Sequence, residues 1–291
     1  MTYREIYAVG REILEASGIE EAALDARLLL EYVCGTDRNH LLAYGDRPVQ
    51  EEHDRQYRKL LKQRAGRIPL QYLTGMQGFM GLEFLVNEHV LIPRQDTEIL
   101  VEEVLKNLHD GMSILDLCTG SGCILISLLR YTNDCCGTGV DISPEALSVA
   151  RENAKRLIPE SFLQEEGENG TRLHFLESNL YDRVEGAFDI IVSNPPYIPT
   201  KVIDSLMPEV RDNEPRLALD GSEDGLLFYR KIIEGSRMHL KGGGMLFFEI
   251  GSDQGTAVRE LMERAGFLEV SVTKDYAGLD RVVSGTQMFS R

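Results

Sequence analysis

From residue 96 onward the sequence alternates short apolar runs with amphipathic stretches of helical periodicity. The strand-like runs are residues 113–117, 138–140, 173–176, 189–192, 245–250 and 268–273, and the helical stretches between them include residues 123–131, 144–157 and 255–265. Strands that alternate with helices pair mainly in parallel, because a crossover helix returns the chain to the same end of the sheet. The pattern therefore predicts an α/β fold with a doubly wound, mainly parallel sheet covered by helices on both faces.

The first part of the chain has a purely helical pattern. Apolar residues recur at helical spacing at Ile6, Val9, Ile13 and Leu14, and residues 23–33 and 52–64 form two further amphipathic stretches. The third stretch carries Arg and Lys on its polar face, which we expect to be solvated unless an acidic partner docks there. The pattern predicts a small helical bundle appended to the α/β part, and appended bundles often bind a partner.

Between these parts, residues 78–93 change character again. Their apolar side chains predict two short strands on either side of Asn87 and Glu88, which we interpret as a β-hairpin that joins two domains. The predicted organisation is an N-terminal helical docking domain at residues 1–75, a β-hairpin linker at residues 76–93, and a ligand-binding α/β domain at residues 94–291.

A turn of small residues follows the first predicted strand of the α/β domain. Its residues are Cys118, Thr119, Gly120, Ser121 and Gly122. Such a turn lets a ligand approach the backbone, and Asp141, at the end of the next strand, is placed to accept hydrogen bonds from ribose hydroxyls. The pattern Asp116-x-Cys-x-Gly-x-Gly departs from the GxGxxG of dinucleotide folds and suits S-adenosylmethionine, which has no pyrophosphate. Asp116 either faces the positively charged methionine end of this cofactor or caps nearby N–H groups.

The strand at residues 189–192 leads into Asn194-Pro195-Pro196-Tyr197. The two prolines have fixed φ and no N–H, so the segment is stiff and rich in hydrogen-bond acceptors. The Asn194 side-chain oxygen and the Pro195 carbonyl can together bind a planar NH₂ group that donates two hydrogen bonds. The segment lies at the carboxyl end of a predicted strand, where α/β folds bind ligands, so we interpret it as a site rather than a simple strand terminator.

Composition narrows the classes of function. The net charge is −16, from 47 acidic and 31 basic residues, and a bulk acidic field disfavours binding to nucleic acid. The five cysteines form no CxxC pair and the six histidines are dispersed, so we expect neither a disulfide framework nor a metal site. No apolar run reaches membrane-spanning length and the N-terminus lacks a signal-like apolar stretch, which together predict a cytoplasmic protein without a membrane partner.

With these motifs in one chain, the sequence closely resembles the HemK/PrmC family. The matching stretches are PLQYLTG (69–75), FMGLEFLVNEHVLIPRQDTE (79–98), DLCTGSG (116–122), SNPPYI (193–198), EPRLALDGSEDGL (214–226), FFEIGSDQG (247–255) and Asp280-Arg281. The resemblance implies a Rossmann-like class I methyltransferase domain that transfers a methyl group from S-adenosylmethionine to the glutamine side-chain nitrogen of the Gly-Gly-Gln motif in peptide chain release factors. Three positions depart from the family pattern: Cys118 and Ser222 replace common glycines, and Gln95 replaces a proline.

The resemblance also implies roles for single residues. The loop from Cys118 to Gly122 would line the methionine half of the cofactor, Asp141 its ribose, and Asn179 and Leu180 its adenine, although Leu180 is equally suited to the core. Asn194 would contact both cofactor and substrate. Asn194 and Pro195 would hold the glutamine NH₂, with Pro196 and Tyr197 beside it and Tyr197 packed against the substrate amide. Arg94 and Glu98 are interpreted as structural.

Two alternatives remain at this point. An adenine-N6 DNA or RNA methyltransferase presents the same NH₂ geometry to the Asn-Pro-Pro-Tyr segment, but the acidic net charge disfavours it. The second alternative is a non-catalytic adapter with a vestigial Rossmann-like domain. An adapter would not need the small-residue loop, Asp141 and the Asn-Pro-Pro-Tyr segment, so the presence of all three disfavours it.

Overall fold

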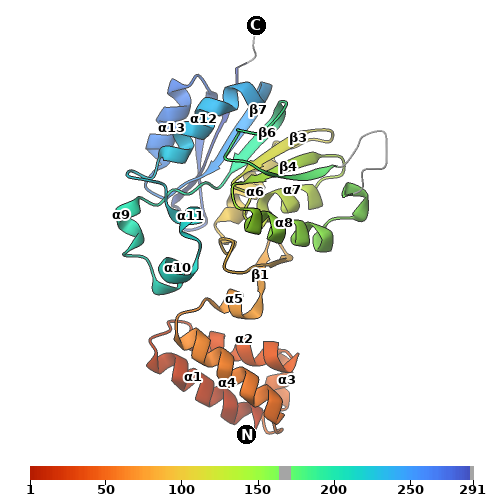
Figure 1. The fold of residues 1–291 in the computed structure, drawn as a ribbon, viewed down its shortest axis with the longest axis vertical. Coiled ribbons are helices and arrows are strands. Elements are labelled where there is room, and N and C mark those ends of the chain that lie inside the picture. Colours follow the sequence, from red (N-terminus) through yellow and green to blue (C-terminus); the bar gives the residue numbers. More distant parts are fainter. Residues whose placement is uncertain (164–171, 289–291) are drawn as a thin grey trace. The chain divides into compact units, whose positions relative to one another are not determined.

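The computed structural model describes residues 1–163 and 172–288 (Figure 1). It divides into two compact units. One comprises Met1–Met76 together with Met207–Asn213, and the other comprises Gln77–Leu206 and Glu214–Arg291. The division expected from the sequence differs from this in two respects, because the hairpin region belongs to the second unit and a short segment from the α/β part belongs to the first.

The first unit is all helical. Its elements are α1 (Tyr3–Ala16), α2 (Ala22–Cys34), α3 (Arg38–Ala43), α4 (Glu51–Ala65), α5 (Leu70–Thr74) and α10 (Pro208–Asn213). The three predicted helices are present as α1, α2 and α4, and they enclose a core that includes Ile6, Leu14, Leu29, Tyr57 and Leu61. The sequence analysis missed the short helices α3, α5 and α10, which are held by this core and by polar contacts rather than by a long apolar stripe.

A buried ion network fastens α10 to the rest of the first unit. Arg64 Nε lies 2.6 Å from Asp25 Oδ2, and Glu209 Oε1 lies 3.1 Å from both Arg64 Nη1 and Arg67 Nη1. Arg64, Asp25 and Glu209 are all buried. The basic face of α4 is therefore not solvated along its whole length, because its last arginine is satisfied inside the unit.

The Tyr57 hydroxyl is a polar group buried in the core of the helical unit. It donates a hydrogen bond of 2.9 Å to the Ala26 carbonyl, and it lies directly over Gly10, where an added Cβ would meet it at 2.0 Å. We expect Tyr57→Phe to destabilise the first unit by about 1–2 kcal/mol, because a buried hydrogen bond is lost. Native-state hydrogen exchange of the α1 and α2 amides measures the loss of stability.

Tyr7→Phe is the matched control for this substitution. Tyr7 also donates to a carbonyl of α2, that of Ala23, but its hydrogen bond is 3.3 Å long and exposed. Its loss should change stability by less than about 0.5 kcal/mol, the usual effect of a surface substitution. Equal losses from both substitutions would show that burial does not make the Tyr57 hydrogen bond stronger.

The second unit begins with a hairpin whose position differs from the predicted one. Its strands are β1 (Met76–Phe79, which starts at the unit boundary) and β2 (Leu82–Leu85), joined by Met80 and Gly81, both with positive φ (50° and 69°). The prediction of a hairpin around Asn87 and Glu88 is wrong. Asn87 instead accepts a hydrogen bond from the His89 amide through its side chain and forms a local turn, and residues 90–92 form no strand.

A seven-stranded sheet forms the centre of the second unit (Figure 1). Its strands are β3 (Ser113–Leu117), β4 (Cys136–Asp141), β5 (Leu173–Glu177), β6 (Phe188–Ser193), β7 (Leu240–Glu249), β8 (Leu268–Lys274) and β9 (Asp280–Thr286). The spatial order is β5-β4-β3-β6-β7-β9-β8, and β9 is antiparallel to both of its neighbours. The predicted α/β fold with a mainly parallel sheet is confirmed, and only β9 was not predicted.

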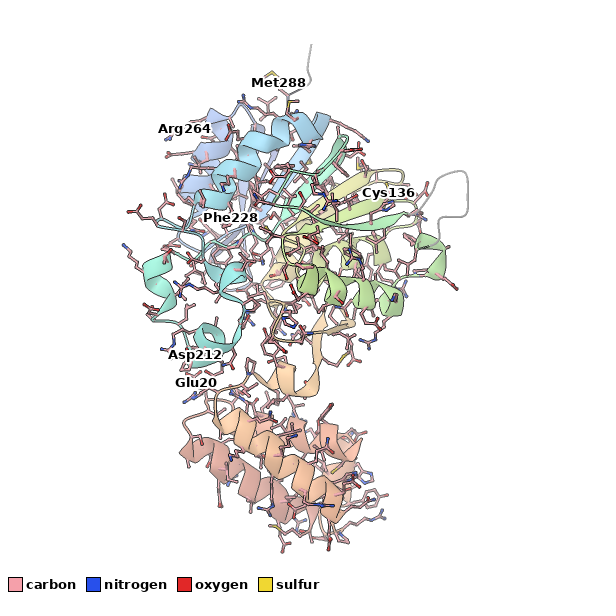
Figure 2. The ribbon with its side chains drawn as sticks, in the orientation of Figure 1. Glu20, Cys136, Asp212, Phe228, Arg264 and Met288 are labelled. Carbon is pink, nitrogen blue, oxygen red and sulfur yellow. The ribbon has the colours of Figure 1, made fainter. Side chains whose placement is uncertain are left out.

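Helices cover both faces of the sheet. They are α6 (Thr97–Leu105), α7 (Cys123–Arg130), α8 (Pro144–Leu157), α12 (Leu227–His239) and α13 (Gly255–Arg264). The connecting segments contain the short helices α9 (Thr200–Ile203) and α11 (Arg216–Leu219) and a 3₁₀ turn at Glu160–Phe162. α6, α7 and α8 pack with side chains such as Ile114 and Ile190 in one core, whereas α12 and α13 pack with Leu115 and Ile191 in another. Side chains fill both layers (Figure 2).

The strand order places a switch point in the middle of the sheet. After β3 the chain moves to β4 on one side and later returns to β6 on the other. The carboxyl ends of β4, β3 and β6 are therefore neighbours, and the segments that follow them meet at one edge. No helix in the described part of the chain is long and apolar enough to cross a membrane.

Candidate functional site

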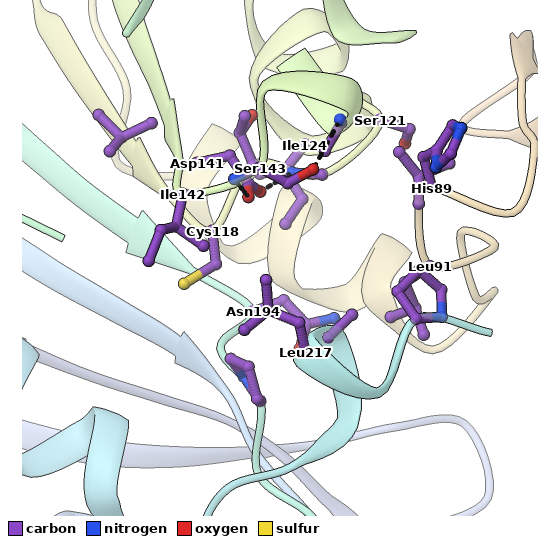
Figure 3. A pocket seen from close by; sticks show the side chains of 18 of the residues that line it. His89, Leu91, Cys118, Ser121, Ile124, Asp141, Ile142, Ser143, Asn194 and Leu217 are labelled. Atoms are coloured by element: carbon purple, nitrogen blue, oxygen red, sulfur yellow. Dashed lines mark hydrogen bonds between the residues drawn. The ribbon is translucent and has the colours of Figure 1, made fainter. Parts of the chain in front are cut away.

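A cavity of about 320 Å³ opens at this edge of the sheet, within the size range of small-molecule sites (Figure 3). Its lining brings together most of the predicted site residues. These are Cys118, Thr119, Gly120, Ser121, Asp141, Asn179, Leu180, Asn194 and Pro196. Asp116, Gly122, Pro195 and Tyr197 are not among the lining residues.

The loop after β3 is held open toward the cavity by its backbone conformation. Cys118, Gly120 and Gly122 all have positive φ (61°, 54° and 79°). Cys118 thus adopts the left-handed conformation that the glycine common at this position adopts easily, at a cost of about 1–2 kcal/mol for a residue with a Cβ. At Gly120 an added Cβ would meet no atom within 4 Å, so the backbone there borders open space. Gly122 instead permits close packing, since its Cβ would meet Ile126 at 2.9 Å.

Asp141 joins the two loops that border the cavity. Its Oδ2 accepts a hydrogen bond from the Gly120 amide (2.9 Å) and its Oδ1 accepts one from the Ser143 amide (3.0 Å). Burial raises the pKa of Asp141, against the opposing effect of these backbone donors. The carboxylate therefore orders the site as well as lining it (Figure 3).

Asp116 lies beneath the loop after β3 and outside the cavity lining. It is fully buried, does not line the cavity, and accepts a 2.6 Å hydrogen bond from the Thr119 hydroxyl. Burial raises its pKa to about 7, with the Thr119 hydroxyl acting in the opposite direction. The hydrogen-bond donor is a hydroxyl of the loop, so the carboxyl supports the loop from within, and the prediction that it caps N–H groups or faces the methionine end of the cofactor stays a prediction.

The Asn-Pro-Pro-Tyr segment leaves β6 beside the cavity. Asn194 Nδ2 donates to Thr97 Oγ1 over 3.4 Å. Among the described residues, no hydrogen bond is found to the Asn194 side-chain oxygen or to the Pro195 carbonyl. Both acceptors that the sequence analysis assigned to an NH₂ group are thus left without a protein donor, although Pro195 itself is buried and does not line the cavity.

Tyr197 is not among the cavity-lining residues, and its packing against a substrate amide stays a prediction. Its hydroxyl donates to Glu249 Oε1 (3.4 Å), and its carbonyl accepts from Gln254 Nε2 (3.0 Å). An added Cβ on Gly225 would meet the Tyr197 carbonyl oxygen at 2.3 Å, so the loop at residues 221–225 packs directly on this backbone. Tyr197 therefore anchors the segment in the protein rather than lining the cavity.

Asn179 and Leu180 lie at the cavity after β5. Leu180 has a φ of 50°, lines the cavity and also packs into the core beneath it. Its place in the core is thus confirmed, and its contact with adenine stays a prediction. Asn179 Nδ2 donates to Asp182 over 3.2 Å.

Several lining residues were missed by the sequence analysis. They include His89, Leu91, Thr97, Ile142, Leu217, Phe228 and Lys231. Ile142 directly follows Asp141 and is 49% exposed, which is unusual for isoleucine and is a signal of a binding surface. The others come from distant segments, so no sequence spacing connects them.

Arg94 and Glu98 lie at the border of the second unit's core. Arg94 lines the cavity and pairs with Glu214, whose pKa is raised by burial and lowered by this guanidinium. Glu98 accepts a 2.6 Å hydrogen bond from the Met80 amide and ties the hairpin turn to α6. Among the residues described, no group of three His, Cys, Asp or Glu side chains is arranged to hold a metal ion.

Comparisons with known proteins show to which class of protein this fold belongs. A family model described as "PrmC N-terminal domain" matches residues 5–75, and one described as "Methyltransferase small domain" matches residues 94–210. A methyltransferase from Pyrococcus furiosus shares the fold, with a TM-score of 0.51, 20% identity, and coverage of 72% of this chain and 90% of that one. The fold is therefore that of a Rossmann-like methyltransferase, as predicted.

Full-length relatives identify the family. The chain is 40% identical to the release factor glutamine methyltransferase of Geobacter sulfurreducens, over 98% of this chain and 96% of the relative. It is 41% identical to the release factor glutamine methyltransferase of Caulobacter vibrioides, over 99% of this chain and 97% of the relative. This chain belongs to the release factor glutamine methyltransferase family, and the predicted resemblance is confirmed.

Proposed function

We propose that this protein transfers a methyl group from S-adenosylmethionine to the side-chain amide nitrogen of the glutamine in the Gly-Gly-Gln motif of peptide chain release factors. The observation that carries the proposal is the pair of unengaged acceptors at Asn194 and Pro195, at the edge of a cavity bordered by the Asp141 loop. Membership in a family whose members are named release factor glutamine methyltransferases supports the same substrate.

The cavity lining fits S-adenosylmethionine. The open space beside Gly120 and the lining carboxylate of Asp141 suit a ribose with its hydroxyls. The apolar side chains of Ile142, Leu180 and Phe228 line the same cavity and suit an adenine ring. The backbone at the start of α7 presents N–H groups that favour a carboxylate. When bound, S-adenosylmethionine supplies an electrophilic methyl group on a positively charged sulfur.

The contribution of the protein is to position the glutamine nitrogen. An amide nitrogen is a poor nucleophile because its lone pair is delocalised into the carbonyl. In our proposal, Asn194 Oδ1 and the Pro195 carbonyl accept the two N–H hydrogen bonds and hold the nitrogen with one face free. Positioning of this kind supplies up to roughly 7–11 kcal/mol in the best-oriented reactions. Tyr197 and Pro196 stiffen the segment that carries both acceptors.

The adenine-N6 methyltransferase alternative requires a docked nucleic acid. The net charge of −16 opposes such docking, and this chain's relatives are named for a protein substrate. We therefore propose a protein substrate without a direct nucleic-acid partner, and we propose that the enzyme acts in the cytoplasm, where release factors work. A vestigial adapter is disfavoured by the complete cavity.

Mass spectrometry tests the proposed function directly. Purified protein, S-adenosylmethionine and an intact release factor should yield one added methyl group on the Gly-Gly-Gln glutamine. Duplex DNA in place of the release factor should yield no methyladenine. Methylation of adenine at a rate that matches the release factor would overturn the proposal.

The helical unit is proposed to dock the release factor through the exposed basic side chains of α4. Arg55, Lys59 and Lys62 are exposed on this helix. Reversal of all three charges to Glu should lower kcat/KM for an intact release factor by about tenfold, because rim charges act mainly on association. The affinity for S-adenosylmethionine, measured by calorimetry, should stay unchanged.

The control for this experiment is a triple reversal of exposed basic residues in the second unit. Arg130, Arg237 and Arg264 are exposed there, and their reversal changes the net charge by the same amount. If both triple variants lose activity equally, overall charge rather than an α4 docking surface explains the effect.

A further inference from the structure

Gln254 is a buried amide side chain that the proposed methyl transfer does not use. It directly precedes α13, it is 7% exposed, and it does not line the cavity. A buried polar group destabilises the fold unless its hydrogen bonds are satisfied, so the partners of Gln254 indicate what it does. Two of these partners belong to the segment that follows β6 and to the loop that packs on that segment.

The amide of Gln254 makes hydrogen bonds through both of its ends. Its Oε1 accepts from the Gly251 amide (3.0 Å) and from the Tyr229 hydroxyl (3.3 Å). Its Nε2 donates to the carbonyls of Tyr197 (3.0 Å) and Gly225 (3.4 Å). A backbone N–H only donates and a carbonyl only accepts, so a single orientation of this amide satisfies its backbone partners. The NH₂ group of Gln254 is therefore fixed toward Tyr197.

The Tyr197 carbonyl lies next to a short backbone pairing. The Ile198 amide donates to the Leu219 carbonyl (3.0 Å), and the Gly221 amide donates to the Ile198 carbonyl (2.8 Å). Among the described residues, no backbone donor is found for the Tyr197 carbonyl. Gln254 supplies the hydrogen bond that the backbone pairing lacks at this position. It therefore extends the attachment of the segment to the neighbouring loop by one residue.

The loop at residues 221–225 approaches both the segment and the Gln254 amide closely. An added Cβ on Gly221 would meet the Cα and the carbonyl carbon of Tyr197 at 2.7 Å, and one on Gly225 would meet Gln254 Nε2 at the same distance. The Gln254 NH₂ group therefore lies between two backbone segments and joins their carbonyls.

The other end of the Asn-Pro-Pro-Tyr segment is held by the sheet. Ser193 is the last residue of β6, pairs with Leu117 of β3, and donates its hydroxyl to the Leu117 carbonyl over 2.7 Å. Residues 194–196 lie between the two attachments, and the Pro195 carbonyl accepts no hydrogen bond from the described residues. Proline fixes φ but leaves ψ free to rotate. The place of both acceptors therefore depends on how firmly the far end, at Tyr197, is held.

We propose that Gln254 is a positioning residue for the methyl transfer, which holds the Asn194 and Pro195 acceptors in place by anchoring the Tyr197 carbonyl. It touches neither substrate nor cofactor and acts through the backbone. This inference rests on the proposed function, because the exact place of the two acceptors matters only if a substrate NH₂ group binds them. Displacement of a reacting group by about 1 Å lowers a rate by up to roughly 100-fold.

Two substitutions in the full-length protein remove the donor. Gln254→Glu keeps an oxygen for the Gly251 amide but places a carboxylate against two carbonyls, and Gln254→Met keeps the length of the side chain without a donor. Each should lower kcat for the release factor by about 10- to 100-fold at about pH 8. KM should change little, because the loss concerns the placement of reacting groups. The Kd for S-adenosylmethionine should not change, since the hydrogen bonds of Asp141 do not involve Gln254.

Gln254→Glu also offers a rescue within one variant. A protonated carboxyl donates one hydrogen bond, so it replaces the donor that the segment has lost. Burial favours this protonated form, and so do the carboxylates of Glu249 and Asp253 beside Tyr229, whereas Arg281 opposes it. The kcat of Gln254→Glu, divided by that of the wild type, should therefore rise as the pH falls from about 8 to about 6. The same ratio for Gln254→Met should stay constant.

Gln287 provides the matched control. Its Nε2 also donates to two backbone carbonyls, those of Arg237 (3.4 Å) and Leu240 (3.3 Å), but it follows β9 and does not line the cavity. Gln287→Glu and Gln287→Met should leave kcat and its pH dependence unchanged. The proposed role is overturned by a wild-type kcat in either Gln254 variant, by a ratio for Gln254→Glu that does not change with pH, or by equal losses in the Gln287 variants.

A readout without activity separates this inference from the proposed function. Hydrogen exchange of the Ile198 and Gly221 amides should become about tenfold faster in Gln254→Met, the usual effect of one lost hydrogen bond. The Thr119 amide, which donates to the Val140 carbonyl, should exchange as in the wild type. If the wild type fails to methylate a release factor, the proposed function fails, and this exchange still decides whether Gln254 anchors the segment. Unchanged exchange at Ile198, or the same acceleration at Thr119, contradicts the anchoring.

Discussion

Replacing Asn194 with alanine is expected to lower kcat for methyl transfer by about 10²- to 10³-fold, the usual cost of removing one preorganised hydrogen-bonding group from a reaction site. The reason is that one of the two acceptors for the substrate NH₂ disappears while the Pro195 carbonyl remains. The affinity for S-adenosylmethionine should be largely preserved, because the loop after β3 and Asp141 are unchanged. Single-turnover methylation followed by mass spectrometry measures the rate of methyl transfer, and calorimetry measures the affinity for S-adenosylmethionine.

Asn107→Ala is the control for this prediction. Asn107 donates its side-chain amide to the Glu103 carbonyl at the end of α6 and does not line the cavity, so its loss should leave kcat unchanged. Full turnover by purified Asn194→Ala would remove Asn194 from the reaction. A collapse of cofactor affinity in the same variant would instead show that Asn194 acts mainly on the cofactor.

Asp141→Asn is expected to weaken S-adenosylmethionine binding by about 1.5–3 kcal/mol, or roughly 10- to 150-fold in Kd, the usual scale for a charged hydrogen bond. The structure gives this prediction a second cause. Asp141 holds the amides of Gly120 and Ser143 with its two oxygens, whereas asparagine has only one acceptor oxygen. One of the two loops is therefore released, in addition to the loss of the charged contact to ribose.

Asp134→Asn provides the comparison, because Asp134 is an exposed carboxylate that precedes the same strand, β4. Its substitution should not change Kd. Calorimetry that gives the same affinity for Asp141→Asn and the wild type would exclude Asp141 from the cofactor site. Circular dichroism should show both variants folded, since Asp141 ends β4 at the cavity and its carboxyl contacts loop amides rather than core side chains.

The sequence predicted the elements whose stability comes from their own apolar pattern. All six strands predicted in the α/β part exist. Five of them pair in parallel, and a buried parallel strand must be apolar along its length, whereas the sixth, β8, is an antiparallel strand at the edge of the sheet. β9 was missed because its serine and glycine interrupt the apolar run, and its pairing with β7 and β8 supplies what the pattern lacks. The hairpin was misplaced because a Met-Gly turn is a weaker signal than Asn-Glu, although the backbone there adopts positive φ at both residues.

In the candidate site, the sequence by itself determined which segments meet. The carboxyl ends of neighbouring parallel strands share one edge of the sheet, so the loop after β3, Asp141 and Asn194 had to lie together once the strands were identified. Only the tertiary structure decided which way the side chains face. Asp116 and Tyr197 make their side-chain hydrogen bonds inside the protein, and Asn194 donates to Thr97, a residue 97 positions away from it in the chain. Orientation of this kind depends on which donor and acceptor are close in space, and no spacing along the chain contains that information.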